Sequence, residues 1–436
     1  MRIRFKYQTL TFLICIVALL YSWSARAESP ANSVLTTLPS KLSTTNNVVF
    51  TQNGEVGLVA AYSESDDSSG HYVYSFNSVT GKVLDKFDTQ PSGVNPTKLT
   101  ITSNNVLVIA ASASVSDEAS IVTVPINSDG SFDNSHQVFI NFAVPTSTED
   151  SFLPNDIAVS SNGAYGIYSN KSHIFVFSIS TGQVVFQERV GIDLYSPQNR
   201  LESISYDSVN NRLGVIKQVN GQYYLYVYSL TDEGHLEVKS LITLLQDEII
   251  GFGSKVAFSD NGNKVYVASS NKGFLSCYDV ASASPIARQY IPALADTEAE
   301  DAKFLEINVQ YNNNSNLVYI QKPGHIQKPG HIQKPGHIQK PGHIQKPGHI
   351  AIVSSNLFNV VFDKTYTSSL ADVAINLDGS SIFIATDNGE LNKVNLADLN
   401  EVFQVNFDSL LQLGLNEKTQ NLILTHPQGI NLINAN

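Results

Sequence analysis

The chain has 436 residues, with 27 lysine and arginine residues against 39 aspartate and glutamate residues, which gives a formal net charge of −12. Nucleic acid is bound mainly through basic side chains, so this acidic balance argues against nucleic acid as a partner. Cys15 and Cys277 are the only cysteines, so no disulfide framework is expected to hold the fold together.

Residues 1–27 have the three-part form of a secretory signal peptide. Basic residues precede an apolar run from Leu10 to Leu20, and Ala25-Arg26-Ala27 supplies a small-x-small cleavage pattern. The run is shorter than the roughly 20 residues needed to span a bilayer, so we expect no membrane span. A lipid anchor at Cys15 is the alternative, but Ile14 stands before it where a small residue is expected. We therefore expect an exported protein, periplasmic or extracellular.

The mature chain repeats one plan of short apolar strands and tight turns, and no linker rich in proline, glycine or serine divides it. The plan is clearest at residues 254–280, where alternating apolar strands flank an Asp-Asn-Gly turn. It recurs at residues 156–186, with Asn162-Gly163 in the first turn, and at residues 372–396, with Asp378-Gly379. Glycine suits these turns because they require positive φ.

The first strand of each unit is predicted to start near Val48, Lys98, Asp156, Ser203, Lys255, Phe304, Asp372 and Leu410. Most of these spacings are close to 50 residues, and periods of this size made only of short strands are typical of β-propeller blades. We therefore predict an all-β fold over residues 48–436. It is a single β-propeller of four-stranded antiparallel blades, eight by count, or seven if one weak unit is not a full blade.

The last unit shows only three strands before the chain ends. Val34 to Leu38, in the N-terminal segment 28–47, has the β-branched content of an outer strand. We predict that this segment supplies the missing fourth strand and closes the ring.

Residues 255–268 and 154–168 combine an apolar strand, a Ser-x-Asp/Asn-Gly turn and a second strand of the Val-Tyr-Val kind. This pattern resembles the YVTN-type β-propeller repeat, which is found in exported proteins of bacterial type. The resemblance covers most of the mature chain and is loose in the second and fourth units. The resemblance implies an exported or surface-exposed binding propeller and assigns no catalytic residue.

Residues 320–349 are five perfect copies of IQKPGH. One copy alone would leave a strand, a Lys-Pro-Gly-His turn and another strand, so the array is interpreted as a duplicated hairpin turn that forms an irregular basic flap. Removing the 24 extra residues shortens a 68-residue spacing to 44, which agrees with the other blades.

The histidines of the array are candidate ligands for a transition metal, because imidazole is a common ligand of zinc, copper and nickel. The alternative, which we favour, is that they are copies of one turn residue. These histidines are His325, His331, His337, His343 and His349.

In a propeller, the turn between the second and third strands lies on the same face as the connections between blades, and this face usually carries the binding site. The predicted connections contain a set of acidic residues, which are our candidates for the binding face. They are Glu149, Asp150, Asp247, Glu248, Asp296, Glu298, Glu300 and Asp301.

Sequence motifs for catalysis are scarce. The chain has no Gly-x-Ser-x-Gly, no His-Glu-x-x-His, no phosphate loop and no Cys-x-x-Cys, and Cys277 is predicted to be a core residue. Pro154-Asn155-Asp156 is similar to the Pro-Asn-Asp of the gluconolactonase and senescence-marker propellers, in which the asparagine helps to hold a divalent metal. The alternative is that Asn155 and Asp156 form a polar turn leading into a strand.

These sequence features are compatible with two functions. The first, which we prefer, is a noncatalytic binding or scaffold propeller that acts as a monomer, needs no cofactor and binds an unknown protein, peptide or saccharide. The second is a metal-dependent, lactonase-like hydrolase with a divalent ion at Asn155 in the central channel.

Overall fold

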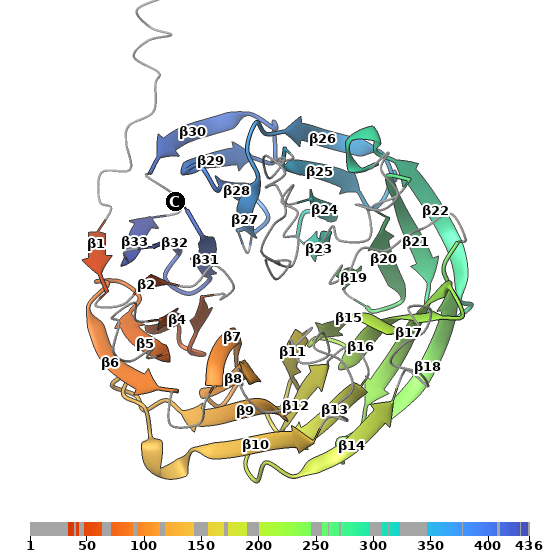
Figure 1. Ribbon diagram of the computed structural model, residues 1–436. Coiled ribbons are helices and arrows are strands. Elements are labelled where there is room, and N and C mark those ends of the chain that lie inside the picture. Colours follow the sequence, from red (N-terminus) through yellow and green to blue (C-terminus); the bar gives the residue numbers. More distant parts are fainter. Residues whose placement is uncertain are drawn as a thin grey trace, which may run out of the picture.

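The computed structural model describes residues 34–38, 41–42, 48–62, 71–89, 94–113, 118–143, 156–169, 173–189, 200–245, 255–259, 261–269, 272–295, 307–312, 314–322, 347–376, 378–407, 410–427 and 429–434. The proposed signal peptide lies outside these residues. The described strands form eight antiparallel sheets arranged in a ring (Figure 1). The predicted all-β propeller is therefore confirmed, with eight blades rather than seven.

Each blade has four successive strands, which we give from the innermost to the outermost, and the sheet of blade 1 also contains a fifth, short strand, β2 (Lys41–Leu42). Blade 1 contains β3 (Val49–Phe50), β4 (Val56–Tyr62), β5 (His71–Asn77) and β6 (Val83–Asp88). Blade 2 contains β7 (Val94–Ile101), β8 (Val106–Ala113), β9 (Glu118–Pro125) and β10 (Val138–Ala143). Blade 3 contains β11 (Asp156–Val159), β12 (Tyr165–Ser169), β13 (His173–Ser178) and β14 (Val184–Arg189). Blade 4 contains β15 (Arg200–Asp207), β16 (Arg212–Val219), β17 (Gln222–Leu230) and β18 (Leu236–Thr243).

The second half of the ring repeats this arrangement. Blade 5 contains β19 (Val256–Phe258), β20 (Lys264–Ala268), β21 (Phe274–Asp279) and β22 (Ser284–Tyr290). Blade 6 contains β23 (Asn308–Asn312), β24 (Leu317–Lys322), β25 (His349–Ser354) and β26 (Val360–Thr365). Blade 7 contains β27 (Leu370–Ile375), β28 (Ser381–Thr386), β29 (Glu390–Asn395) and β30 (Glu401–Asn406). Blade 8 contains β31 (Gln412–Asn416), β32 (Asn421–His426), β33 (Gly429–Asn434) and β1 (Val34–Thr37).

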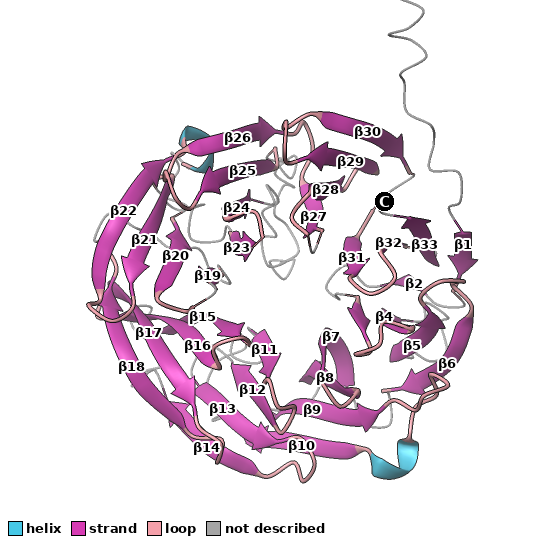
Figure 2. Ribbon diagram, turned by 180° about the vertical axis from the view of Figure 1, so that it is seen from behind, coloured by secondary structure: helices cyan, strands magenta, loops and turns pink. Residues whose placement is uncertain are grey.

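Helical structure is minor in the part of the chain that is described. It consists of two short 3₁₀ segments, η2 (Asn134–His136) and η3 (Pro292–Leu294) (Figure 2). Within these same residues, no helix is long and apolar enough to cross a membrane.

The N-terminal segment closes the ring, as predicted. β1 pairs antiparallel with β33 and is the outermost strand of blade 8. The chain then reaches blade 1, where β2 (Lys41–Leu42) pairs with β4, and the Leu42 amide donates to the Pro427 carbonyl of blade 8 (3.3 Å). β3 also pairs with β4, so the innermost strand of blade 1 is split in two. The sequence predicted a single strand starting near Val48.

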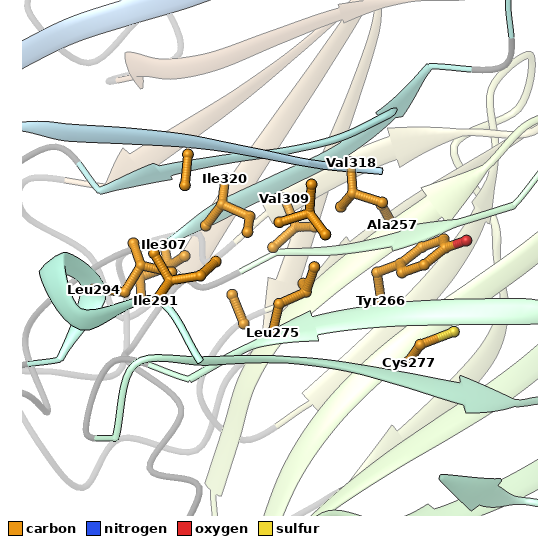
Figure 3. Close-up of a cluster of buried hydrophobic side chains, with 13 residues drawn as sticks. Ala257, Tyr266, Leu275, Cys277, Ile291, Leu294, Ile307, Val309, Val318 and Ile320 are labelled. Carbon is orange, nitrogen blue, oxygen red and sulfur yellow. The ribbon is translucent and has the colours of Figure 1, made fainter. Parts of the chain in front are cut away.

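The apolar core lies between the blades. Successive side chains of a strand point to opposite faces of its sheet, so each blade can bury apolar side chains against both neighbours. Eight clusters of buried apolar residues result, one at each junction around the ring. In the cluster between blades 5 and 6, Tyr266 and Cys277 of blade 5 pack with Val318 of blade 6 (Figure 3). Burial raises the pKa of the Cys277 thiol to about 11, and the prediction of a core cysteine is confirmed.

Strand direction gives the ring two distinct faces. Strands alternate in direction within a blade, so the first and third strands of every blade start on one face, which we call the upper face. The short turns between first and second strands lie on the opposite, lower face, where hydrogen bonds join neighbouring blades. These bonds run from Asn416 Nδ2 to the Gly54 carbonyl (2.6 Å), from the Gln52 amide to Asn105 Oδ1 (2.7 Å), from the Ser161 amide to the Tyr206 hydroxyl (3.1 Å) and from Arg212 Nη1 to the Gly262 carbonyl.

Candidate functional site

Four blades carry a charged residue at one equivalent position of the innermost strand. Each of these residues stands seven positions before the residue with positive φ in the following lower-face turn. The pairs are Lys98 with Asn105, Asp156 with Gly163, Lys255 with Gly262, and Asp372 with Gly379. Charged side chains are rare in a propeller core, so this position marks the part of the innermost strands most suited to binding.

Three of these residues meet in what we call the Lys–Asp–Lys cluster: Lys98, Asp156 and Lys255. The Lys98 ammonium lies 3.5 Å from Asp156 Oδ1, and the Lys255 ammonium contacts Asp156 Oδ2. The cluster therefore joins blades 2, 3 and 5 through a single carboxylate. Its side chains keep exposed fractions of 33% for Lys98, 14% for Asp156 and 22% for Lys255, so solvent reaches all three.

Lys255 reaches Asp156 past blade 4, which lies between their blades in the ring. Blade 4 carries small serine side chains here, and the Ser205 hydroxyl accepts a hydrogen bond from the Val256 amide (3.0 Å). The Lys255 ammonium also donates to the Ile204 carbonyl of blade 4 (3.1 Å). The ammonium is therefore fixed by both a carboxylate and a backbone carbonyl.

Asp156 begins β11, and its Oδ1 accepts a hydrogen bond from the Ile157 amide (3.0 Å). Asp156 thus leads directly into a strand, while its neighbour Asn155 lies outside the described residues, and sequence reasoning missed the two lysine partners of Asp156. The available signal was the alternation of lysine and aspartate at the predicted strand starts Lys98, Asp156, Lys255 and Asp372.

Most site residues predicted from the sequence lie outside the described residues. These are the acidic candidates Glu149, Asp150, Asp247, Glu248, Asp296, Glu298, Glu300 and Asp301, the metal candidate Asn155, and the array histidines His325, His331, His337 and His343. Their roles stay predictions.

The array lies between the second and third strands of blade 6, as predicted. β24 ends at Lys322 and β25 begins at His349, and these two residues are paired in the sheet. The last Pro-Gly-His unit is integrated into the blade, because the Gly348 amide donates to the Ser368 carbonyl and the Gly348 carbonyl accepts from the Tyr366 amide (both 2.8 Å). The two ends of the array are therefore parts of the sheet itself.

His349 is buried and directed into blade 6. Its Nδ1 lies 2.9 Å from the Thr365 hydroxyl, and its Nε2 lies 2.8 Å from Asp363 Oδ1, a distance suited to an ion pair although the angles do not suit a hydrogen bond. Burial lowers the pKa of His349, the Asp363 carboxylate opposes this effect, and the Lys322 ammonium adds to it. Metal binding by His349 would have to displace these contacts.

A buried lysine, Lys217, joins blades 3 and 4. The Lys217 ammonium contacts the Glu188 carboxylate, donates to the Tyr228 hydroxyl (2.6 Å) and lies 4.2 Å from the centre of the Tyr226 ring. Burial lowers the pKa of Lys217, and Glu188 partly offsets this effect. Only 4% of the Lys217 side chain is exposed, so this group holds two blades together and is closed to a ligand.

Within the described residues, no group of three or more histidine, cysteine, aspartate or glutamate side chains is arranged to hold a metal ion. The solvent-accessible charged group among these residues is instead the Lys–Asp–Lys cluster. Such an arrangement can position a polar or charged ligand.

Comparison with known proteins supports the fold and leaves the family open. No family model matches the chain, and no curated protein matches it. Among solved structures, the chain is similar to the computationally designed Ika8 protein, with a TM-score of 0.56 and 12% identity over 92% of this chain and 98% of that chain. It is also similar to the β-propeller domain of Cps50 (Swd1) from Myceliophteria thermophila, with a TM-score of 0.50 and 9% identity over 78% and 97%.

Raptor from Chaetomium thermophilum is a further similar structure, with a TM-score of 0.50 and 10% identity. The match covers 92% of this chain but only 28% of Raptor. At these identities the similarities show a β-propeller fold alone, and the YVTN-type repeat stays a prediction.

Proposed function

We propose that this chain is an exported, noncatalytic binding propeller that acts as a monomer and holds a protein, peptide or saccharide ligand on its upper face. The Lys–Asp–Lys cluster is the observation that carries the proposal. It brings solvent-accessible charge from three blades to one point on the innermost strands. An eight-bladed ring packed at every junction is a rigid support for such a group, since binding residues need a scaffold that holds their geometry.

The metal-dependent hydrolase is the less favoured alternative. Its metal would lie close to Asn155, the neighbour of Asp156, yet the ammonium groups of Lys98 and Lys255 both contact the Asp156 carboxylate. Like charges repel strongly where water is partly excluded, so two ammonium groups oppose a divalent cation at this point. The same charges favour a polar or anionic ligand.

The two functions can be separated with one protein sample. The chain would be expressed with its native N-terminus and collected from the exported fraction, where cleavage after Ala27 is expected. We expect saturable binding to members of peptide or glycan arrays, and no lactone hydrolysis with added calcium, zinc or manganese. Metal-dependent hydrolysis that disappears in Asn155→Ala would overturn the proposal in favour of the hydrolase.

A further inference from the structure

Three turns of the lower face carry an Asn-Gly pair directly after a hydroxyl residue and one intervening position. Asn-Gly is a dipeptide especially prone to spontaneous deamidation, because glycine has no side chain to shield its backbone nitrogen. The three pairs are Asn53-Gly54 after Thr51, Asn162-Gly163 after Ser160, and Asn261-Gly262 after Ser259.

Deamidation joins two groups of this dipeptide. The glycine backbone nitrogen gives up its proton to a base and attacks the asparagine Cγ atom, a new C–N bond closes a succinimide ring, and the side-chain amide takes up a proton and leaves as ammonia. Water then opens the ring at either carbonyl and yields aspartate or isoaspartate. The reaction therefore needs a glycine N–H that can lose its proton and an asparagine side chain that can turn toward it.

The hydroxyl residue of the turn in blade 3 holds both reacting groups. The Ser160 carbonyl accepts a hydrogen bond from the Gly163 amide (2.9 Å), and the Ser160 hydroxyl donates to Asn162 Oδ1 (2.7 Å). The Ala164 amide donates to the same oxygen (3.0 Å), so the Asn162 side chain is fixed toward the residues that follow it. One serine thus restrains the nucleophilic nitrogen and the carbon that it would attack.

The same two contacts recur in two other blades. In blade 5, the Ser259 carbonyl accepts from the Gly262 amide (2.7 Å), and the Ser259 hydroxyl donates to Asn261 Oδ1 (2.9 Å). In blade 1, Thr51 makes the equivalent two contacts at 2.8 Å each. A hydrogen-bonded amide loses its proton only when the local structure opens, so each of these turns protects its glycine nitrogen.

We propose that Asn53, Asn162 and Asn261 are sites of spontaneous deamidation that the folded ring keeps unreactive through the hydroxyl residue of each turn. A site reacts when its turn opens, so the modification marks chains whose blades have opened locally. Isoaspartate would add a backbone carbon where space is short, since a Cβ atom on Gly163 would already lie 2.9 Å from Ser103 Oγ of blade 2. The inference concerns the lower face and is independent of the ligand proposed for the upper face.

Ser160→Ala tests the proposal, because it removes the hydroxyl and keeps the carbonyl. The folded variant and the unchanged protein are incubated at mildly alkaline pH, and deamidation of Asn162 is followed by peptide mapping with mass spectrometry. We expect Asn162 to react about tenfold faster in Ser160→Ala, since the hydroxyl bond to Asn162 and the one accepted from the Tyr165 amide (2.9 Å) are both lost. Ser160→Thr keeps a hydroxyl and should react like the unchanged protein.

Two controls separate a local effect from a general one. Asn261 is an internal reference in the same molecules, and its rate should not change in Ser160→Ala. Ser161→Ala is the matched variant, because Ser161 contacts blade 4 through its backbone amide, which the substitution keeps. Its Asn162 rate should equal that of the unchanged protein. An equal rise at Asn162 and Asn261 in Ser160→Ala would indicate general destabilisation and overturn the inference.

Other outcomes also contradict the inference. An unchanged Asn162 rate in Ser160→Ala would show that the hydroxyl gives no protection. Deamidation of Asn162 in the folded protein as fast as in the chain unfolded by urea would show that the turn is not protected at all. If Ser160→Ala does not fold, Ser259→Ala supplies the same test at Asn261, with Asn162 as the reference.

Discussion

At the scale of single residues, Gly54 shows why one of the lower-face turns requires glycine. Its φ is +73°, and its carbonyl accepts a hydrogen bond from Asn416 Nδ2 across the junction between blades 8 and 1. A Cβ atom at this position would lie 2.6 Å from both Asn416 Oδ1 and Lys418 Cβ. Glycine therefore meets two separate demands here, a left-handed backbone and a close approach of the neighbouring blade.

Gly221 meets only the first of these demands, the left-handed backbone. Its φ is +81°, but a Cβ atom there would meet nothing within 4 Å. We expect Gly221→Ala to cost about 1–2 kcal/mol of unfolding free energy through backbone strain alone. Gly54→Ala should cost a further 1–3 kcal/mol, roughly, because the blade junction becomes overpacked. Thermal melts of both variants provide the check, and equal melting temperatures would show that the junction yields easily.

The contacts of the Lys–Asp–Lys cluster also belong to this scale. The sequence could predict that its three residues are equivalent in their blades, but not that their side chains meet. The repeat shows that Lys98, Asp156 and Lys255 occupy equivalent positions, since the lower-face turn follows each at the same distance. It does not show that Lys255 reaches past blade 4, because that contact depends on small side chains in another unit and on the curvature of the ring. Periodicity identifies equivalent positions but carries no distances between them.

At the scale of elements, the hairpin that contains the array shows how a long insertion is tolerated. β24 and β25 form a regular antiparallel pair up to Lys322 and His349, with 26 residues between these two. The free-energy cost of closing a loop grows by only about 0.6 kcal/mol for each doubling of loop length. The insertion therefore lowers the stability of the blade only slightly. Sequence reasoning identified this hairpin correctly because five identical copies reduce to one ordinary turn.

The number of copies should affect stability in a non-monotonic way. Deleting residues 326–343 leaves two copies and a loop of eight residues, and the final Gly348 keeps its hydrogen bonds to blade 6. Deleting residues 326–349 leaves one copy and a two-residue Pro-Gly loop. Two-residue hairpins favour positive φ at their first loop residue, which proline cannot adopt, so we expect this chain to open its last strand pair and to turn through all four residues of Lys-Pro-Gly-His.

We therefore expect the two-copy chain to melt at or slightly above the temperature of the full chain, because its loop is shorter. The one-copy chain should fold but melt below the two-copy chain. We expect it to lose two backbone hydrogen bonds, each of which contributes about 0.5–1.5 kcal/mol to stability. Differential scanning calorimetry of the three chains gives the order. A one-copy chain that melts highest would show that proline does not limit the hairpin.

At the scale of the whole molecule, closure of the ring determines whether eight blades unfold together. Sequence predicted the blade number and the closing strand because the final unit lacks a fourth strand and Val34 to Leu38 can supply one. It did not predict the splitting of the first strand of blade 1. Both β2 and β3 pair with β4, so the N-terminal segment contacts blade 8 and blade 1 in succession. Short paired segments such as Lys41–Leu42 carry too little pattern to be found in a sequence.

The double attachment predicts a cooperative role for the N-terminal segment. Without β1, the edge of β33 is left unpaired. Gly81 also loses its close neighbour Thr36, whose hydroxyl would lie 2.5 Å from a Cβ atom placed on Gly81. An unpaired edge strand destabilises a sheet and invites pairing with other chains. A disulfide cannot compensate, because Cys277 is the only cysteine after residue 27.

Three N-terminal truncations test this role. A chain starting at residue 34 should melt like the mature protein, whereas a chain starting at residue 39 loses β1 and should melt several degrees lower in one cooperative transition. A chain starting at residue 43 also loses β2 and should melt lower still. In the intact protein, amides of β1 should exchange with deuterium nearly as slowly as those of β32, because both open only when the ring opens. Fast exchange in β1 together with unchanged melting of the second truncation would show that the packed junctions hold the ring without their closing strand.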